Sequence, residues 1–346
     1  MKKIIVGHRS KHHSGYSGYS RLIDFLEDTI AIPSGKSKNI VPYRIAKFIA
    51  SNLDKKKGEY NTDSVEKEAE LFKVLTKYKD KKSIIHYLNA ERDIRFAINQ
   101  KWYYTKDTFI GTFHKPNEIL KKQIPKTKYL KMLDGAICVG PNQVDFIKDW
   151  LNIDNVKFIP HGIDTNFFTP DNTKREESTL LFVGQHLRDF KSFNYCIPKI
   201  AEKIPDLKVN VILHSSYMKY IEPHNAVKVF SKVNDIDLKQ YYQNATALFL
   251  PMLNSTACNS ILEAMAMGLP IISSDVGGNY GYVNDKNAIL VPKGDDDFLI
   301  DTTVALLKNE DKLNKMSLMS IEASKQFDWK NVAKQVNDFY SYCAIN

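Results

Sequence analysis

The sequence contains no long apolar run and no paired cysteines, and both absences exclude classes of protein. No stretch approaches the about 18 apolar residues that a membrane-spanning helix needs. The apolar run near the N-terminus, Ile4–Val6, is too short for a signal peptide. No C-x-x-C pair or tight cluster occurs among the four cysteines, Cys138, Cys196, Cys258 and Cys343. We therefore expect buried thiols in a reducing compartment and a cytoplasmic protein, soluble or peripheral at the inner face of a membrane.

The chain is basic, with a formal net charge of +9 over 346 residues. Two interpretations stay open: a lysine-rich surface that is simply solvated, or an anionic partner. No zinc-finger spacing or aromatic-basic RNA signature is present, so we expect no nucleic acid. Segment 115–131 interleaves lysines with apolar residues, which is typical of a surface lying on an anionic membrane. Core-facing helices show the same apolar spacing.

Short apolar runs alternate with helical patterns along the whole chain, which predicts two doubly wound α/β domains facing across a cleft. With 43% hydrophobic residues the chain can bury two cores. We predict a first domain over 1–168, an exposed linker over 169–178 and a second domain over 178–328. A terminal helix begins near Trp329. Strands are expected at 3–6, 83–88, 108–113, 134–139, 179–183, 208–213, 227–230, 247–250 and 271–274.

One stretch, 247–291, contains the clearest chemical signal. It runs as a buried strand, a polar loop, a helix over Ile261–Met267, a second strand and the pair Gly277-Gly278. A helix start after a loop presents backbone N–H groups, which favour anions such as phosphates. Glu263 is expected near the mouth of this helix.

This stretch resembles the retaining family 4 glycosyltransferases of GT-B architecture. Their Glu-x7-Glu motif, LEAMA-x-G-x-P segment and glycine pair correspond to Glu263, 262–270 and Gly277-Gly278. The first glutamate of the motif is replaced by Ser255, and the glutamate after the glycine pair falls on Gly281. The resemblance covers most of the second domain, and the first domain only through a glycine loop and one histidine. It implies that the terminal helix, about 329–346, crosses back onto the first domain.

The resemblance implies a donor site for a nucleotide-diphosphate-sugar on the second domain. Glu263 would accept the ribose hydroxyls, and Asn259 and Ser260 would donate to the distal phosphate. Thr256 or Ser255 takes the place of the missing glutamate. The family pattern Val-Gly-Arg followed by Lys corresponds to Val183, Gly184, Gln185 and Lys191.

Lys191 would stabilise the departing diphosphate, since developing negative charge needs a cation there. Gln185 cannot supply that charge, whereas Arg188 in the same loop could. An ion pair between Arg188 and Asp189 in a solvated loop is the alternative.

The first domain is expected to contribute a phosphate loop and a sugar contact. Gly15 and Gly18 follow the first strand, and in the family this loop closes over the donor diphosphate. The segment ending in His114 resembles the family's Thr-x-His, whose imidazole lies near the reacting sugar.

The end of the 83–88 strand predicts an acceptor side, because ligands bind beyond the carboxyl ends of parallel strands. His86, Glu91 and Arg92 are the candidates there. A structural pair of Glu91 with Arg92 or Arg95 is weighed equally.

No metal is expected. Asp235-Ile236-Asp237 and 294–297 are interpreted as helix starts, and His8, His12 and His13 as a solvated loop.

The sequence thus predicts a transferase that moves a sugar from a nucleotide-diphosphate-sugar to a hydroxyl of a glycan or lipid-linked acceptor, with retained configuration and no cofactor. Cell-surface glycan, polysaccharide or glycolipid synthesis is the expected setting. Departures at Gln185, Ser255 and Gly281 leave open a nucleotide-sugar-binding relative without transferase activity. An epimerase or phosphorylase on the same fold is a third alternative.

Overall fold

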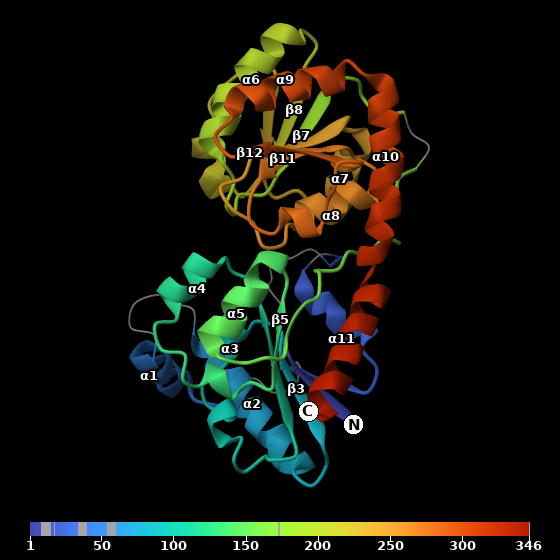
Figure 1. Cartoon of the computed structure of the whole chain (residues 1–346). Helices are drawn as coiled ribbons and strands as arrows, with labels where there is room; N and C mark the ends of the chain where they lie inside the picture. Colours follow the sequence, from blue (N-terminus) through green and yellow to red (C-terminus); the bar gives the residue numbers. More distant parts are fainter. Residues whose placement is uncertain (8–14, 17, 34–39, 54–59, 172–173, 346) are drawn as a thin grey trace. The chain divides into compact units, whose positions relative to one another are not determined.

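The chain folds into two compact α/β units. The computed structural model describes residues 1–7, 15–16, 18–33, 40–53, 60–171 and 174–345 (Figure 1). Unit 1 comprises 1–12, 19–160 and 329–346, and unit 2 comprises 13–18 and 161–328. Residues 161–168, expected at the end of the first domain, belong to unit 2. The reason is local, because Ile163 N–H donates to the Phe327 carbonyl at 2.9 Å and His161 N–H to the Tyr282 hydroxyl at 2.9 Å.

Unit 1 is built on a six-stranded parallel sheet of order β2-β1-β3-β4-β5-β6. Its strands are β1 Lys2–Val6, β2 Thr29–Ile32, β3 Ser83–Tyr87, β4 Thr108–Phe113, β5 Gly135–Cys138 and β6 Val156–Phe158. Its α-helices are α1 Tyr43–Leu53, α2 Thr62–Tyr78, α3 Ala90–Asp93, α4 Asn117–Gln123, α5 Val144–Leu151 and α11 Trp329–Ile345. Residues Tyr19–Phe25 form a 3-10 helix, η1, and α11 packs on it.

Unit 2 repeats the design with the parallel order β12-β11-β10-β7-β8-β9. Its strands are β7 Thr179–Val183, β8 Lys208–Ile212, β9 Val227–Phe230, β10 Ala247–Leu250, β11 Ile271–Asp275 and β12 Ala288–Pro292. Its α-helices are α6 Phe190–Lys203, α7 Asp235–Asn244, α8 Asn259–Ala266, α9 Asp296–Leu307 and α10 Glu310–Ser324. Helix α6 packs on α9, and α8 packs on α10 (Figure 1). Together the two units give the predicted GT-B fold.

Strand order places one switch point in each sheet, where consecutive strands turn to opposite sides. In unit 1 it lies between β1 and β3, and in unit 2 between β7 and β10. Loops that follow strands at a switch point diverge and leave room for a ligand at the carboxyl edge of the sheet. The candidate residues predicted from sequence lie at these two edges.

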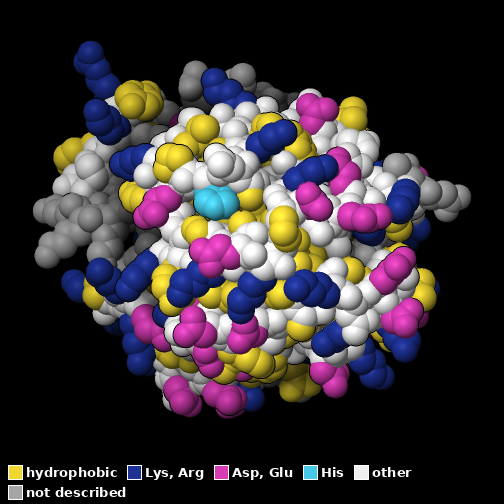
Figure 2. All heavy atoms as spheres, turned by 90° about the horizontal axis from the view of Figure 1, so that it is seen from above, with side chains coloured by type: hydrophobic (Ala, Val, Ile, Leu, Met, Phe, Trp, Pro, Cys, Tyr) yellow, Lys and Arg dark blue, Asp and Glu magenta, His cyan; other side chains and the backbone are white. Residues whose placement is uncertain are grey.

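Segment 115–131 does not form an apolar membrane face. Leu120, Ile124 and Leu130 are buried in the core of unit 1, so the core-facing interpretation of their spacing is correct. On the face shown in Figure 2, Lys and Arg side chains are interspersed with Asp and Glu. Within the described residues, no helix has the length and apolarity to cross a bilayer.

Candidate functional site

At the carboxyl edge of the unit 2 sheet, three loops are joined to one another by main-chain hydrogen bonds. The loop after β7 pairs with the loop after β10, because Asp189 N–H donates to the Pro251 carbonyl at 2.9 Å and Leu253 N–H to the Leu187 carbonyl at 2.8 Å. The turn after β11 joins them through Gly278 N–H, which donates to the Ser255 carbonyl at 2.9 Å. These main-chain bonds fix the loops around the start of α8.

Gly277 allows the closest of these approaches. Its φ is +55°, and a Cβ at this position would lie 2.8 Å from the carbonyl carbon of Ser255. A side chain would therefore both strain the backbone and overlap the β10–α8 loop. The glycine pair singled out from sequence is required for this packing.

Arg188 is buried beneath the loop after β7 and lies 7% exposed. Its Nε and Nη2 donate to the Val183 carbonyl at 3.1 and 2.9 Å, and Nη2 also reaches Ser260 Oγ at 3.3 Å. The predicted alternative, a pair with Asp189, is wrong, because the Asp189 carboxylate caps α6 by accepting from Ser192 N–H at 3.1 Å. Arg188 is thus a buried cation that ties the loop to the start of α8.

Helix α8 begins at Asn259, two residues earlier than predicted, with Cys258 as its N-cap. In the described chain no side chain caps this end. Ser260 donates its hydroxyl to the Val183 carbonyl at 3.2 Å, and Asn259 is half-buried. Ser255 and Thr256 are buried in the preceding loop. An uncapped helix start above a buried guanidinium is a favourable position for an anion.

Glu263 lies in the second turn of α8 and is 4% exposed. One carboxylate oxygen accepts a hydrogen bond from the Tyr242 hydroxyl at 2.8 Å. Burial, followed by the negative charge of Glu263, raises the pKa of Tyr242 far above its ordinary value, so the phenol stays a donor. Tyr242 comes from α7 and was not predicted; no motif links it to Glu263 in the sequence.

Lys191 is exposed in the first turn of α6. Its ammonium group makes no hydrogen bond or ion pair with the described residues. The structure therefore places an unneutralised cation in the first turn of the helix that follows the β7 loop. Gly184, with φ +86°, starts that loop, and an added Cβ would approach Arg188 Nη2 to 3.1 Å.

Gly15 and Gly18 belong to unit 2. Gly15 N–H donates to the Asp235 carboxylate at 2.8 Å, and the ring of Tyr16 stacks on Phe167 with centroids 3.6 Å apart. The helix start predicted at Asp235–Asp237 is confirmed, since α7 begins at Asp235, and its cap is Asn234, which accepts from Asp237 N–H at 2.9 Å. Residues 8–14, including the three histidines, lie outside the described residues.

His114 and Glu91 come together at the carboxyl edge of the unit 1 sheet. Glu91 accepts from His114 N–H at 2.9 Å, and His114 Nε2 lies 2.6 Å from the Leu88 carbonyl. The ring of Tyr19 meets the imidazole edge-on at 4.7 Å. Burial raises the pKa of Glu91, and the neighbouring His114 opposes that rise. The edge holds a fixed imidazole backed by a buried carboxyl group.

His86 does not lie at this edge. It is fully buried on β3, with Nδ1 2.6 Å from the Tyr340 hydroxyl and Nε2 2.7 Å from Thr112 Oγ1. Burial, together with His114, lowers its pKa to about 3. The prediction that His86 meets an acceptor is wrong in this structure, because Nδ1 is bonded to Tyr340 of α11 and Nε2 to Thr112 of β4.

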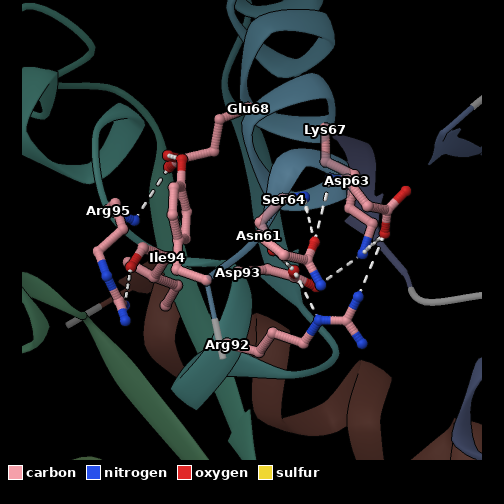
Figure 3. Close-up of polar contacts among 10 residues, drawn as sticks. Asn61, Asp63, Ser64, Lys67, Glu68, Arg92, Asp93, Ile94 and Arg95 are labelled. Atoms are coloured by element: carbon pink, nitrogen blue, oxygen red, sulfur yellow. Dashed lines mark hydrogen bonds and ion pairs between the residues drawn. The ribbon is translucent and has the colours of Figure 1, made fainter. Parts of the chain in front are cut away.

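Arg92 is held by carboxylates of α2 and α3 (Figure 3). Its Nη2 donates to Asp63 at 3.3 Å, and its Nε lies 3.7 Å from Asp93. Asp93 also pairs with the buried Lys67 at 3.0 Å. The structural pairs predicted for Glu91 are wrong, since Arg92 binds aspartates, and the Arg95 guanidinium lies over the rings of Tyr60 and Tyr129.

The described residues include no group of three or more His, Cys, Asp or Glu side chains that could hold a metal. Asp295 caps α9 by accepting from Phe298 N–H at 3.2 Å, so the helix start predicted there is confirmed.

The segment predicted as an exposed linker contains an arginine whose structural role the sequence pattern did not reveal. Arg175 donates to carbonyls at the ends of α7 and α8, those of Ala245 at 2.9 Å and Met267 at 2.6 Å among them.

Comparison with known proteins agrees with this geometry. Residues 177–309 match the family model of glycosyl transferases group 1. The D-inositol 3-phosphate glycosyltransferase of Corynebacterium diphtheriae is 24% identical over 56% of this chain and 52% of its own length. The phosphatidyl-myo-inositol mannosyltransferase of Mycobacterium leprae is 25% identical over 54% of each chain. The chain thus spans about half the length of these curated relatives.

Solved structures share the fold over the whole chain. Anabaena HepE in complex with UDP has a TM-score of 0.69 at 15% identity, covering 99% of this chain and 100% of that one. Sucrose-phosphate synthase from Thermosynechococcus elongatus has a TM-score of 0.64 at 16% identity, covering 98% and 88%. The chain thus shares the GT-B fold of these structures, and its unit 2 is similar to the group 1 glycosyltransferases.

Proposed function

We propose that this protein transfers a sugar from a nucleotide-diphosphate-sugar to a hydroxyl acceptor, with retained anomeric configuration and without a metal. The observation that carries the proposal is the uncapped start of α8, which lies at the switch point of unit 2 above buried Arg188. A diphosphate there would meet helix N–H groups and Asn259, with Lys191 available to neutralise the leaving group.

Two residues take modified roles in this proposal. Arg188 is a positioning residue, because its N–H groups are directed to main-chain carbonyls and to Ser260. Glu263 remains the proposed ribose contact, with Tyr242 orienting its carboxylate. Roles for His114, Gly15 and Gly18 stay predictions.

The acceptor is proposed to be a glycan or lipid-linked molecule in the synthesis of a cell-surface polysaccharide or glycolipid. Support comes from relatives whose names specify inositol phosphate and phosphatidyl-myo-inositol acceptors. A cytoplasmic protein, peripheral at the inner face of the membrane, would fit such an acceptor.

A thermal-shift panel of UDP-, GDP- and ADP-sugars tests donor binding, since a ligand that binds the folded state raises the melting temperature. The proposal expects one base to stabilise the protein, and Glu263→Ala to abolish that shift. Absence of any shift would contradict it. Transfer to a membrane or glycan extract, with the anomer assigned by NMR, then tests reaction and stereochemistry, and EDTA should leave the rate unchanged.

A second candidate is a nucleotide-sugar-binding relative that does not transfer. The observation in its favour is that uncharged residues, Gln185, Ser255 and Gly281, occupy three positions where the family places charged ones. Ser255 is buried, and its hydroxyl oxygen has no partner within the described structure. A donor-dependent thermal shift with neither transfer nor donor hydrolysis would favour this candidate.

A further inference from the structure

Helix α1 of unit 1 presents large apolar side chains to solvent. Tyr43, Ile45 and Phe48 are 66%, 51% and 69% exposed. The helix packs on α2 through small residues, and buried Ala46 and Ala50 form a cluster with Tyr60 and Val65. At 100° per residue, Ile45 and Phe48 lie on the side away from this cluster. The apolar residues therefore do not serve the core of the unit.

The same helix carries two basic residues and no acidic one. It contains Arg44 and Lys47, both exposed, and no Asp or Glu between Tyr43 and Leu53. Two acids of the neighbouring α2 have other partners. Glu66 accepts main-chain N–H groups of Ile40 and Val41 at 2.9 and 3.0 Å, and the Glu68 carboxylate accepts from the Tyr60 hydroxyl at 2.8 Å. Among the described residues, the outer face of α1 thus combines exposed apolar surface with two cations that have no acidic partner.

Behind α1, Arg95 links the buried side of the helix to the lysine-rich segment after α4. The Arg95 guanidinium lies over the ring of Tyr60, which packs against α1, and over the ring of Tyr129, at 5.1 and 4.9 Å. Lys126 and Lys128 flank Tyr129 in sequence and are exposed. The lysines of that segment thus remain a basic surface, although its apolar residues are buried.

We propose that α1 is a docking helix for a bilayer that contains anionic lipids, with Ile45 and Phe48 in the interfacial region and Arg44 and Lys47 at the headgroups. A short helix with apolar and basic residues and no acid binds such a surface in two ways: its apolar side chains insert between the lipids, and its cations are attracted to the anionic headgroups. Charge complementarity selects this partner over a second copy. A symmetric dimer through α1 would bring Arg44 and Lys47 of two chains together and oppose their charges. The proposal concerns a surface of unit 1 and does not require transferase activity.

Co-sedimentation of the full chain with vesicles tests the proposal. We expect binding to phosphatidylcholine vesicles that contain phosphatidylglycerol, and weaker binding to phosphatidylcholine alone. Phe48→Glu should lower partitioning by about tenfold or more, because it removes apolar insertion and adds a repelled charge. Lys47→Gln should lower it by about fivefold. The matched control is Leu318→Glu on α10 of unit 2, where Leu318 is also 69% exposed, and it should bind like the wild type.

Three results would overturn the docking helix. One is no sedimentation with anionic vesicles, and another is equal loss for Phe48→Glu and Leu318→Glu. The third is a concentration-dependent dimer that Phe48→Glu disrupts, which would assign the face to a second copy. The thermal shift with nucleotide sugars, measured on the same variants, should be unchanged by Phe48→Glu. Failure of docking and failure of the proposed donor site are therefore distinguishable.

Discussion

The two carboxyl edges of this protein are the same topological feature built by different means. In unit 2 the loops are joined main chain to main chain, and Arg188 donates to carbonyls. In unit 1 the corresponding loops are held by side-chain carboxylates. Glu91 accepts His114 N–H, and Asp93 binds Lys67 and the Ser64 hydroxyl at 3.0 and 2.8 Å (Figure 3).

The difference determines which groups remain available to a ligand. In unit 1 the cations Lys67 and Arg92 are paired with Asp63 and Asp93, and the edge offers a positioned imidazole, that of His114. Unit 2 keeps an exposed Lys191, an uncapped helix start, and a buried Arg188 that donates to carbonyls and a hydroxyl. This is why we place the anionic part of the donor on unit 2. Four substitutions test the comparison.

Gly277→Ala should have the largest effect. The added methyl group would overlap the Ser255 carbonyl, and φ +55° is strained for alanine, so the cost is expected to be about 4 kcal/mol or more. Chemical denaturation measures the loss, and the nucleotide-sugar thermal shift should disappear with it. Gly294→Ala is the control. Its φ is +88°, but no atom lies within 4 Å of the added Cβ, so only about 1 kcal/mol should be lost. Equal losses would show that the unit 2 edge does not depend on this close approach.

Lys67→Met tests the ionic construction of unit 1. Lys67 and Asp93 are 1% and 0% exposed, and removing one partner of a buried pair leaves the other charge uncompensated. We expect a loss of about 3 kcal/mol in the free energy of unfolding. Lys174→Met breaks an exposed pair with Glu177 and should cost less than about 0.5 kcal/mol. A small effect of Lys67→Met would mean that Arg92 and Ser64 suffice to hold Asp93.

Much of this architecture could be predicted from sequence, and the part that could not has a physical explanation. Apolar runs bounded by Gly or Pro predicted strands such as 108–113 and 247–250 correctly, because parallel strands are buried on both faces. The glycine pair at 277–278 was a valid signal, since only a special backbone position requires it. The family match in unit 2 followed from the same stretch.

Side-chain partners at long sequence separation were not predictable. Tyr242 reaches Glu263 from another helix, and Arg175 binds two helix ends from a segment predicted to be an exposed linker. The spacing of Leu120, Ile124 and Leu130 fits a bilayer or a core equally well, and only the fold distinguishes the two. His86 is another example. Its position near a strand end suggested a ligand contact, and the sequence gave no sign that Tyr340 would cover it.

Lys191→Ala addresses the electrostatics of the unit 2 edge directly. Lys191 is exposed, so the fold should be unaffected, while loss of a cation at the leaving group is expected to lower kcat by about 100-fold. Lys191→Arg should recover part of that loss by keeping the charge. Steady-state kinetics with saturating donor separates the effect on kcat from the effect on KM. An unchanged kcat would move leaving-group stabilisation to another residue.

The effect that is smallest near neutral pH is a pH dependence of stability that arises from unit 1. The pKa of His86 is about 3 in the folded state, against an ordinary value of about 6.5 when unfolded. As pH falls below about 6.5, the imidazole binds a proton in the unfolded chain but stays neutral in the native state. The free energy of unfolding therefore decreases, by up to about 1.4 kcal/mol per pH unit. Buried Glu91, whose pKa is raised, contributes the opposite slope, because its protonated form is favoured in the fold. His86→Gln should therefore remove a downward slope below pH 6.5, measured as the difference between variant and wild-type unfolding free energies. If that difference is independent of pH, the imidazole takes up its proton at the same pH in the folded and the unfolded chain. Below pH 6.5 the hydrogen bonds to Tyr340 and Thr112 must then be assigned to an imidazolium that donates from both nitrogens.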